Sequence, residues 1–177
     1  YIFHHAAVPS VPRSVDDPVT TTDANCTGTA TVLDVARKED VNTVVVASSS
    51  SVYGSTEQLP KVEIMNPQPE SPYALSKYYT EKLALQASQL YDIDTAALRY
   101  FNIFGPRQDP NGDYAAVIPK FISLMLDGDR PVIYGDGEQS RDFTFIDNAI
   151  QANILAAEGD VTGEAFNVGT GGRITIN

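Results

Sequence analysis

The chain has 177 residues, 42% hydrophobic and 20% charged, which is the size and composition of one ordinary domain with a real core. Its 12 basic and 23 acidic residues give a formal net charge of −11, which excludes nucleic acid as an expected partner because phosphate binding needs clustered Lys and Arg. No apolar run approaches the ~20 residues that cross a bilayer, and the single cysteine cannot form an internal disulfide, so we expect a cytoplasmic protein without a membrane partner.

The chain opens on a segment that predicts the end of a buried strand. Residues 1–4 are largely apolar and lead into a loop whose small Ala6 and Ala7 would let a flat ligand lie against the backbone. A domain seldom begins with a bare strand end, so we expect a fragment whose earlier part is missing. A proline-containing loop up to residue 18 follows, and residues 25–39 then predict a helix with an apolar side.

Two further runs predict strands of one sheet. Residues 43–47 are almost entirely β-branched, as in a strand covered on both faces, and residues 95–101 form the next strand. Between them residues 73–90 contain no Gly or Pro and predict a helix of about five turns. This alternation predicts an α/β fold, a doubly wound parallel sheet, with ligands beyond the carboxyl ends of its strands.

Beyond residue 101 turn signals become frequent and the elements become shorter. Residues 105–114 hold Gly-Pro, Asp-Pro and Asn-Gly pairs, which are typical of turns. The elements predicted after this loop are a helix over 115–126, a strand over 132–134, a helix over 145–157, a strand over 165–168 and a short apolar end over 174–176.

Tyr73 and Lys77 stand four residues apart on the predicted helix and therefore on one of its faces. An ammonium beside a phenol favours the phenolate, so Lys77 should lower the pKa of Tyr73 and make it a general base for a sugar hydroxyl. A pair at this spacing is more often a solvated helix face. The catalytic interpretation is supported by polar residues that follow the ends of three predicted strands and would therefore lie at the same edge of the sheet. These residues are His4, the serines at 48–51, and Asn102.

Two cations are candidates for holding phosphate groups. Arg141 could clamp a diphosphate bidentately, and an ion pair with Asp142 or Glu138 explains it equally well. Lys120 stands on a predicted helix, where a solvated charge is the commoner role. No further His or Cys stands at ligand spacing from the two adjacent histidines, so we predict no metal site and take His5 as structural.

Six motifs in a fixed order carry a resemblance to a known family. The chain resembles the extended short-chain dehydrogenases/reductases and, among them, the NAD-dependent nucleotide-sugar epimerase/dehydratase family. The motifs are His4-His5-Ala6-Ala7, Asn25-Cys26-Thr27-Gly28-Thr29, residues 48–54, Pro72-Tyr73-x-x-x-Lys77, residues 99–107, and Gly135-Asp136-Gly137 with Arg141-Asp142-Phe143. Residues 10–14 and 108–120 are most similar to the epimerases that accept UDP-N-acetylhexosamines.

The resemblance implies an NAD(P)-binding Rossmann-like fold that is present only in part. Residues 1–104 would be the C-terminal half of the dinucleotide-binding domain. Residues 105–177 would be a mixed segment, in which loops and helices of a smaller substrate-binding domain are interleaved with the last core helix and strand. The family opens with a Gly-rich G-x-x-G-x-x-G turn that this sequence does not contain. We therefore expect that the chain alone neither retains NAD nor is active.

The resemblance also implies a reaction, the NAD-dependent 4-epimerisation of a UDP-hexose through a 4-keto intermediate. The substrates would be UDP-N-acetylglucosamine and UDP-N-acetylgalactosamine, or UDP-glucose and UDP-galactose. Tyr73 would act as base, Lys77 would lower its pKa and bind the nicotinamide ribose, and Ser49 would orient the hydroxyl and relay the proton. Cofactor contacts are expected from His4, Ala6, Ala7, Ser48, Tyr73, Lys77, Tyr100 and Phe101. UDP-sugar contacts are expected from Ser49, Ser50, Asn102, Ala116, Val117, Lys120, Tyr134 and Arg141.

The serine run distinguishes members of the family. Ser50 and Ser51 stand where 4,6-dehydratases carry Asp and Glu, and decarboxylases carry Glu at the second of these positions. Elimination of water needs that carboxyl pair, so serines favour epimerisation, and Ser51 is expected to fill its position without a role. The alternatives are another nucleotide-sugar oxidoreductase of the family, a 4,6-dehydratase or a decarboxylase, or a non-catalytic sugar-nucleotide-binding remnant.

An oligomer is the last expectation. The helices predicted over 25–39 and 73–90 correspond to those that relatives pair into a four-helix dimer bundle. On the second helix, four residues should leave more apolar surface than one sheet face covers: Leu83, Leu85, Ala87 and Leu90. We therefore expect a homodimer through these helices.

Overall fold

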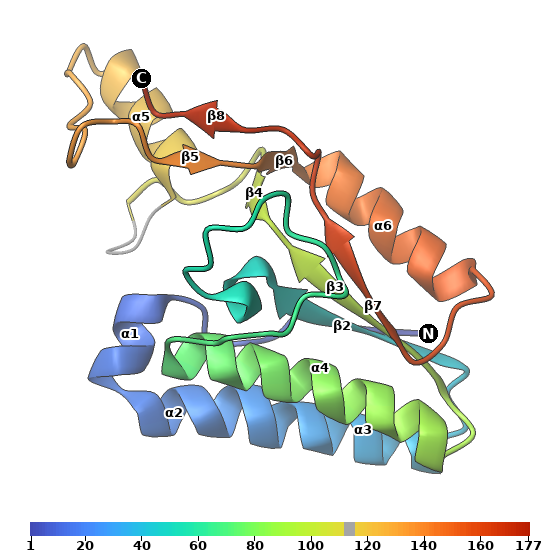
Figure 1. Ribbon diagram of the computed structural model, residues 1–177. Coiled ribbons are helices and arrows are strands. Elements are labelled where there is room, and N and C mark those ends of the chain that lie inside the picture. The colour runs from blue at the N-terminus through green and yellow to red at the C-terminus, as the bar shows by residue number, and fades with distance from the viewer. Residues whose placement is uncertain (112–115) are drawn as a thin grey trace.

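A four-stranded parallel sheet forms the centre of the computed structural model, which describes residues 1–111 and 116–177 (Figure 1). Its strands lie in the order β1-β2-β3-β7, and each pairs in parallel with its neighbour. Their bounds are Ile2–His4 for β1, Thr43–Ser49 for β2, Asp94–Tyr100 for β3 and Glu164–Val168 for β7. The predicted α/β fold with a parallel sheet is confirmed.

The sheet is buried on both faces, which explains its apolar strands. Val44 and Val46 of β2 pack with helices α3 (Gly28–Lys38) and α4 (Pro72–Leu90) on one face. Val45, between them, packs on the other face with helix α6 (Ile146–Glu158). All three valines are 0% exposed. Successive side chains of a strand point to opposite faces, so a strand covered on both sides must be apolar throughout.

Helix α4 (Pro72–Leu90) begins where the sequence predicts. The Ser71 side chain caps it by accepting a hydrogen bond from the Ala74 N–H at 3.1 Å, and Pro72 occupies the first turn at no cost in hydrogen bonding. The expected apolar surface is largely wrong, because Ala87 is buried and Leu83 and Leu85 pack against the core. The large apolar side chains that α4 exposes are Leu75, Tyr79 and Leu90.

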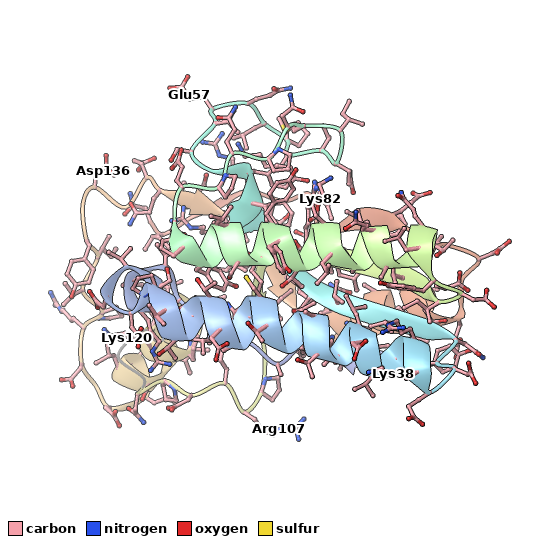
Figure 2. All side chains as sticks on the ribbon, turned by 90° about the horizontal axis from the view of Figure 1, so that it is seen from below. Lys38, Glu57, Lys82, Arg107, Lys120 and Asp136 are labelled. Carbon is pink, nitrogen blue, oxygen red and sulfur yellow. The ribbon has the colours of Figure 1, made fainter. Side chains whose placement is uncertain are left out.

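The predicted proline loop before α3 contains a short helix and the start of a second. Helix α1 (Val11–Asp16) follows a Ser10 cap, and helix α2 (Pro18–Thr22) follows an Asp17 cap. The prediction of a loop was wrong for these residues. A proline stands in the first turn of each helix, where a backbone N–H has no partner within the helix, so proline is tolerated there. A π-helical turn, η1 (Asp23–Thr27), leads from α2 into α3 (Gly28–Lys38), and Figure 2 shows this run lying beside α4.

Shorter elements form a second layer of strands above the carboxyl edge of the main sheet (Figure 1). Strand β4 (Asn102–Phe104) leaves β3 and pairs in parallel with β6 (Phe143–Phe145), and β5 (Ser140–Arg141) pairs antiparallel with β8 (Ile174–Thr175). Helix α5 (Val117–Leu126) lies beside them. The strand predicted over 132–134 has no strand partner within the described residues, and Ala115, where α5 was expected to begin, lies outside those residues.

Segment 105–177 contributes to both layers. Its helix α6 and strand β7 pack into the main sheet, whereas α5, β5, β6 and β8 belong to the second layer. The boundary predicted after residue 104 stays a prediction. Within the described residues, no helix has the length and apolar character of a membrane span.

Candidate active site

The carboxyl ends of the first three strands meet the start of α4 around a cavity of about 410 Å³, which we call the strand-end cleft. Such a position follows from the fold, because loops leaving parallel strands diverge at this edge. Nine of the predicted site residues line it: Ala7, Ser48, Ser49, Ser50, Tyr73, Lys77, Tyr100, Phe101 and Asn102. His5, which was expected to be structural, lines it as well.

Lys77 is held in place by the sheet below the cleft. Its side chain is 5% exposed, and Nζ donates a hydrogen bond to the Ala47 carbonyl oxygen at 3.0 Å. Burial disfavours the charged ammonium and lowers the pKa of Lys77 to about 8. An ammonium carries three donors, so one hydrogen bond to the backbone leaves two protons for a ligand in the cleft.

The pKa of Tyr73 differs from the sequence prediction. Burial raises it, and the nearby Ser49 hydroxyl opposes this by a smaller amount. The expected lowering by Lys77 was wrong for the chain as it stands, because desolvation of the phenol dominates and the Lys77 ammonium is bonded to Ala47. A phenolate at position 73 therefore needs hydrogen-bond donors or charge in addition to its helix neighbour.

The serines that end β2 have three different environments. Ser48 turns into the core, where its hydroxyl donates to the Glu81 carboxylate at 2.9 Å. Ser49 caps the 3₁₀ turn η2 (Ser50–Tyr53), and its Oγ accepts hydrogen bonds from the Ser51 N–H at 3.1 Å and the Ser51 hydroxyl at 2.9 Å. The turn closes at Gly54, whose φ of 64° and close approach to the Gln68 carbonyl oxygen leave no room for a Cβ. Ser51 thus contacts Ser49 directly, and the expectation that it has no role in the reaction stays a prediction.

The two adjacent histidines point to opposite faces of the sheet. His4 is buried and its Nε2 shares a hydrogen bond of 3.0 Å with the Thr29 hydroxyl, while burial and then the charge of Lys77 lower its pKa. His5 lines the strand-end cleft, and its Nε2 bonds the Asn153 side chain at 2.8 Å. The structure thus brings His5 to the cleft in place of His4 and Ala6. The two-residue alternation of a strand could have separated the two histidines.

A buried ion pair supports the cleft from below, and sequence reasoning missed it. Arg99 of β3 donates to both carboxylate oxygens of Glu81 on α4, at 2.8 and 2.7 Å, and the two side chains are 4% and 0% exposed. Arg99 also donates to the Tyr53 hydroxyl at 2.8 Å, which in turn donates to Asn167 at 2.6 Å. The available signal was an Arg inside a buried strand and a Glu one helical turn beyond Lys77, on the same face of α4.

A second cavity of about 590 Å³ lies among β4, α5 and the segment before β5. Six predicted substrate residues line it: Asn102, Ala116, Val117, Lys120, Tyr134 and Arg141. Asn102 also lines the strand-end cleft, so the two cavities adjoin at this residue. We call this second cavity the α5 cavity. The sequence did not single out Gln139, which also lines it and donates to the Tyr134 carbonyl oxygen at 3.0 Å.

Arg141 is not neutralised by the partners that the sequence suggested. The Asp142 carboxylate accepts hydrogen bonds from the Thr170 and Gly171 N–H groups at 3.0 and 2.9 Å, which ties the end of β7 to β6. Within the described ranges no ion pair joins Arg141 to Asp142 or Glu138, and one of its N–H groups donates to the Ser140 carbonyl oxygen at 2.8 Å. Its charge is therefore free to meet an anion in the α5 cavity.

Comparison with known proteins places these motifs in a family context. The model of the NAD dependent epimerase/dehydratase family matches residues 1–169. A putative UDP-glucose 4-epimerase of Methanocaldococcus jannaschii is 42% identical over 177 residues, which are 99% of this chain and 57% of that protein. A UDP-N-acetyl-alpha-D-glucosaminuronate decarboxylase of Bacillus cytotoxicus is 36% identical over 96% of this chain and 53% of that protein.

Solved structures show the same similarity. The UDP-N-acetylglucosamine 4-epimerase of Methanobrevibacter ruminantium M1, in complex with UDP-N-acetylmuramic acid, superposes with a TM-score of 0.97 at 46% identity. The match covers 100% of this chain and 57% of that one. The UDP-glucose 4-epimerase of Thermus thermophilus in complex with NAD gives 0.88 at 35% identity, over 98% of this chain and 57% of its own. The chain thus spans little more than half the length of the relatives it matches.

Proposed function

The chain belongs to the NAD dependent epimerase/dehydratase family, and we propose that the full-length protein carrying it epimerises a UDP-hexose at C4 through a 4-keto intermediate. The observation that carries the proposal is the meeting of Ser49, Tyr73 and Lys77 in the strand-end cleft. A non-catalytic binding protein has no need of a phenol, an ammonium and a hydroxyl at one point. The pairs UDP-N-acetylglucosamine/UDP-N-acetylgalactosamine and UDP-glucose/UDP-galactose are the proposed substrates.

NAD fits the donor set of the strand-end cleft. Lys77 has two protons left for the hydroxyls of a ribose, and Ala7 leaves room for a flat ring beside Tyr100 and Phe101. When bound, NAD supplies the acceptor and donor of hydride for C4 of the sugar. His4, Ala6 and Ser48 stay predicted cofactor contacts, and the first and last of these have side chains bonded to other protein groups.

The proton step belongs to this chain's own residues. Tyr73 as phenolate would take the proton of the sugar 4-hydroxyl, with Ser49 donating a hydrogen bond to the reacting oxygen. Because burial raises the pKa of Tyr73, the phenolate depends on stabilisation by the Lys77 charge and the Ser49 hydroxyl. Tyr73 would return the proton after the sugar has presented its other face.

The α5 cavity suits the uridine diphosphate. The protein carries a net charge of −11, so a diphosphate must be held by local cations, and Lys120 and Arg141 both line this cavity. A guanidinium can bind a phosphate bidentately, and Tyr134 offers an aromatic face to the base. Because the cavities adjoin at Asn102, the sugar would lie at their junction.

A dehydratase or decarboxylase of the same family is the second candidate, favoured by relatives such as the B. cytotoxicus decarboxylase. One observation argues against it. Within the described part of the chain, the residues that line the strand-end cleft include no Asp or Glu, and Ser50 and Ser51 occupy the positions that need carboxylates. A hydride shuttle has no use for that carboxyl pair, whereas elimination of water requires it.

Tyr73→Phe in the full-length protein tests the proposal, because it keeps the ring and its packing and removes the base. Interconversion of the two UDP-sugar pairs should slow by about 10²–10⁴-fold, with UDP-sugar affinity nearly unchanged. Tyr91→Phe, at the far end of α4 and 44% exposed, is the matched control and should keep wild-type turnover. Wild-type turnover in Tyr73→Phe would remove Tyr73 from the mechanism.

A further inference from the structure

The Ser49 hydroxyl has no free acceptor site. A serine hydroxyl has two lone pairs and one proton. Both lone pairs of Ser49 Oγ are taken by Ser51, one by its backbone N–H at 3.1 Å and one by its hydroxyl at 2.9 Å. The first contact is the ordinary cap of η2, and the second is a side-chain contact in addition to it. The only hydrogen-bonding capacity left to Ser49 is its own proton.

Ser49 lines the strand-end cleft, so this proton is available to a group in the cleft. Tyr73 lines the cleft as well, whereas Ser51, within the described residues, does not. We propose that Ser51 is a positioning residue, which orients the single Ser49 proton as a hydrogen-bond donor to one acceptor at a time, the Tyr73 phenolate or the reacting sugar oxygen. This inference rests on the proposed function and adds to it the group that sets the direction of the Ser49 hydrogen bond.

The direction of that hydrogen bond decides which form of Tyr73 is favoured. A hydroxyl that donates to the phenol oxygen stabilises the phenolate, whereas one that accepts from the phenol O–H stabilises the neutral form. Loss of the Ser51 hydroxyl frees a lone pair on Ser49, which can then accept from Tyr73. The remaining cap from the Ser51 N–H keeps Ser49 in place, so the expected change concerns protonation and leaves the fold intact.

Ser51→Thr and Ser51→Val form a matched pair, because the two side chains have the same shape and differ in the hydroxyl. In the full-length enzyme, the ascending limb of the pH profile of kcat should move upward by roughly one pH unit in Ser51→Val. The KM for the UDP-sugar should stay within about twofold, because Ser51 itself does not contact the ligand in this proposal. Ser51→Thr should restore the wild-type profile. Ser88→Ala, which removes a serine hydroxyl bonded to the Leu85 carbonyl oxygen on α4, should leave the profile unchanged.

A direct titration separates this inference from the proposed function. In protein labelled with ¹³C-tyrosine, the resonance that disappears in Tyr73→Phe reports the phenol of Tyr73, and its pKa should be higher in Ser51→Val than in Ser51→Thr. This measurement needs no substrate, so it stands even if no UDP-hexose reacts. Equal Tyr73 pKa values in the two variants, with both folded, would overturn the inference. If Ser51→Val did not fold, Ser51→Ala would take its place against the same prediction.

Discussion

Removing one partner of the buried Glu81–Arg99 pair should be among the most destabilising single changes in this chain. Glu81→Leu leaves a guanidinium at 3% exposure with neither of its two carboxylate contacts. Burial works against the charge of Arg99, but the hydrogen bonds and charge of Glu81, with Tyr53, outweigh it and raise the Arg99 pKa. Glu81→Leu removes most of that compensation, and the guanidinium still stays charged because arginine is not deprotonated in proteins.

The expected loss is about 3–5 kcal/mol, the range for breaking a buried ion pair on one side. Ser48 loses its acceptor at the same time, which places Glu81→Leu toward the upper end. A domain is stable by roughly 5–15 kcal/mol, so this single change removes about a fifth of the total or more. With about 2–4 °C per kcal/mol for a chain of this size, Tm should fall by roughly 6–20 °C.

The double variant Glu81→Leu/Arg99→Met gives the decisive comparison. Replacing both ions by apolar groups removes the uncompensated charge, so the double variant should be more stable than either single variant. Urea unfolding of wild type, both singles and the double, followed by circular dichroism, measures the free energy of unfolding of each. If Glu81→Leu lay within about 1 kcal/mol of wild type, or if the two single effects simply added, the reasoning from burial would be refuted.

Two further predictions concern Lys77 and assembly. Burial lowers the pKa of Lys77 from 10.5 to about 8, so between these pH values the unfolded chain binds more protons at this site than the folded chain. The stability of wild type relative to Lys77→Met should therefore rise between pH 8 and 10.5, by about 3 kcal/mol at most, and urea unfolding at both ends of this window measures the change. If the difference in the free energy of unfolding between wild type and Lys77→Met did not change with pH, the lowered pKa of Lys77 would be contradicted. The outer face of α3 and α4 exposes Val35 (47%), Leu75 (58%) and Tyr79 (44%), so we propose a homodimer of the full-length protein through these helices. Solution scattering at micromolar concentration should give a dimer mass that Leu75→Glu reduces to a monomer mass, and a monomeric wild type would refute the proposal.

The sequence by itself determined the elements whose cause is local. The run of valines before residue 48 had to be a buried strand, and Ser71-Pro72 had to begin a helix, because both follow from burial on two faces and from the hydrogen bonds of a first helical turn. Helical spacing then set Tyr73 and Lys77 on one face, and the structure shows both lining the strand-end cleft, with Asn102 and Arg141 lining the α5 cavity.

Tertiary structure decided what depends on distant neighbours and on solvent. Which histidine reaches the cleft depended on which face of β1 packs on α3, and the direction of the Tyr73 pKa shift depended on how deeply α4 is covered. Glu81 on α4 and Arg99 on β3 meet because the helix packs against the sheet, and their spacing along the sequence does not indicate this contact. Spacing along the sequence indicates which groups lie on the same helix or strand. The desolvation of each polar group and its hydrogen-bond partner are fixed only when the helices pack against the sheet.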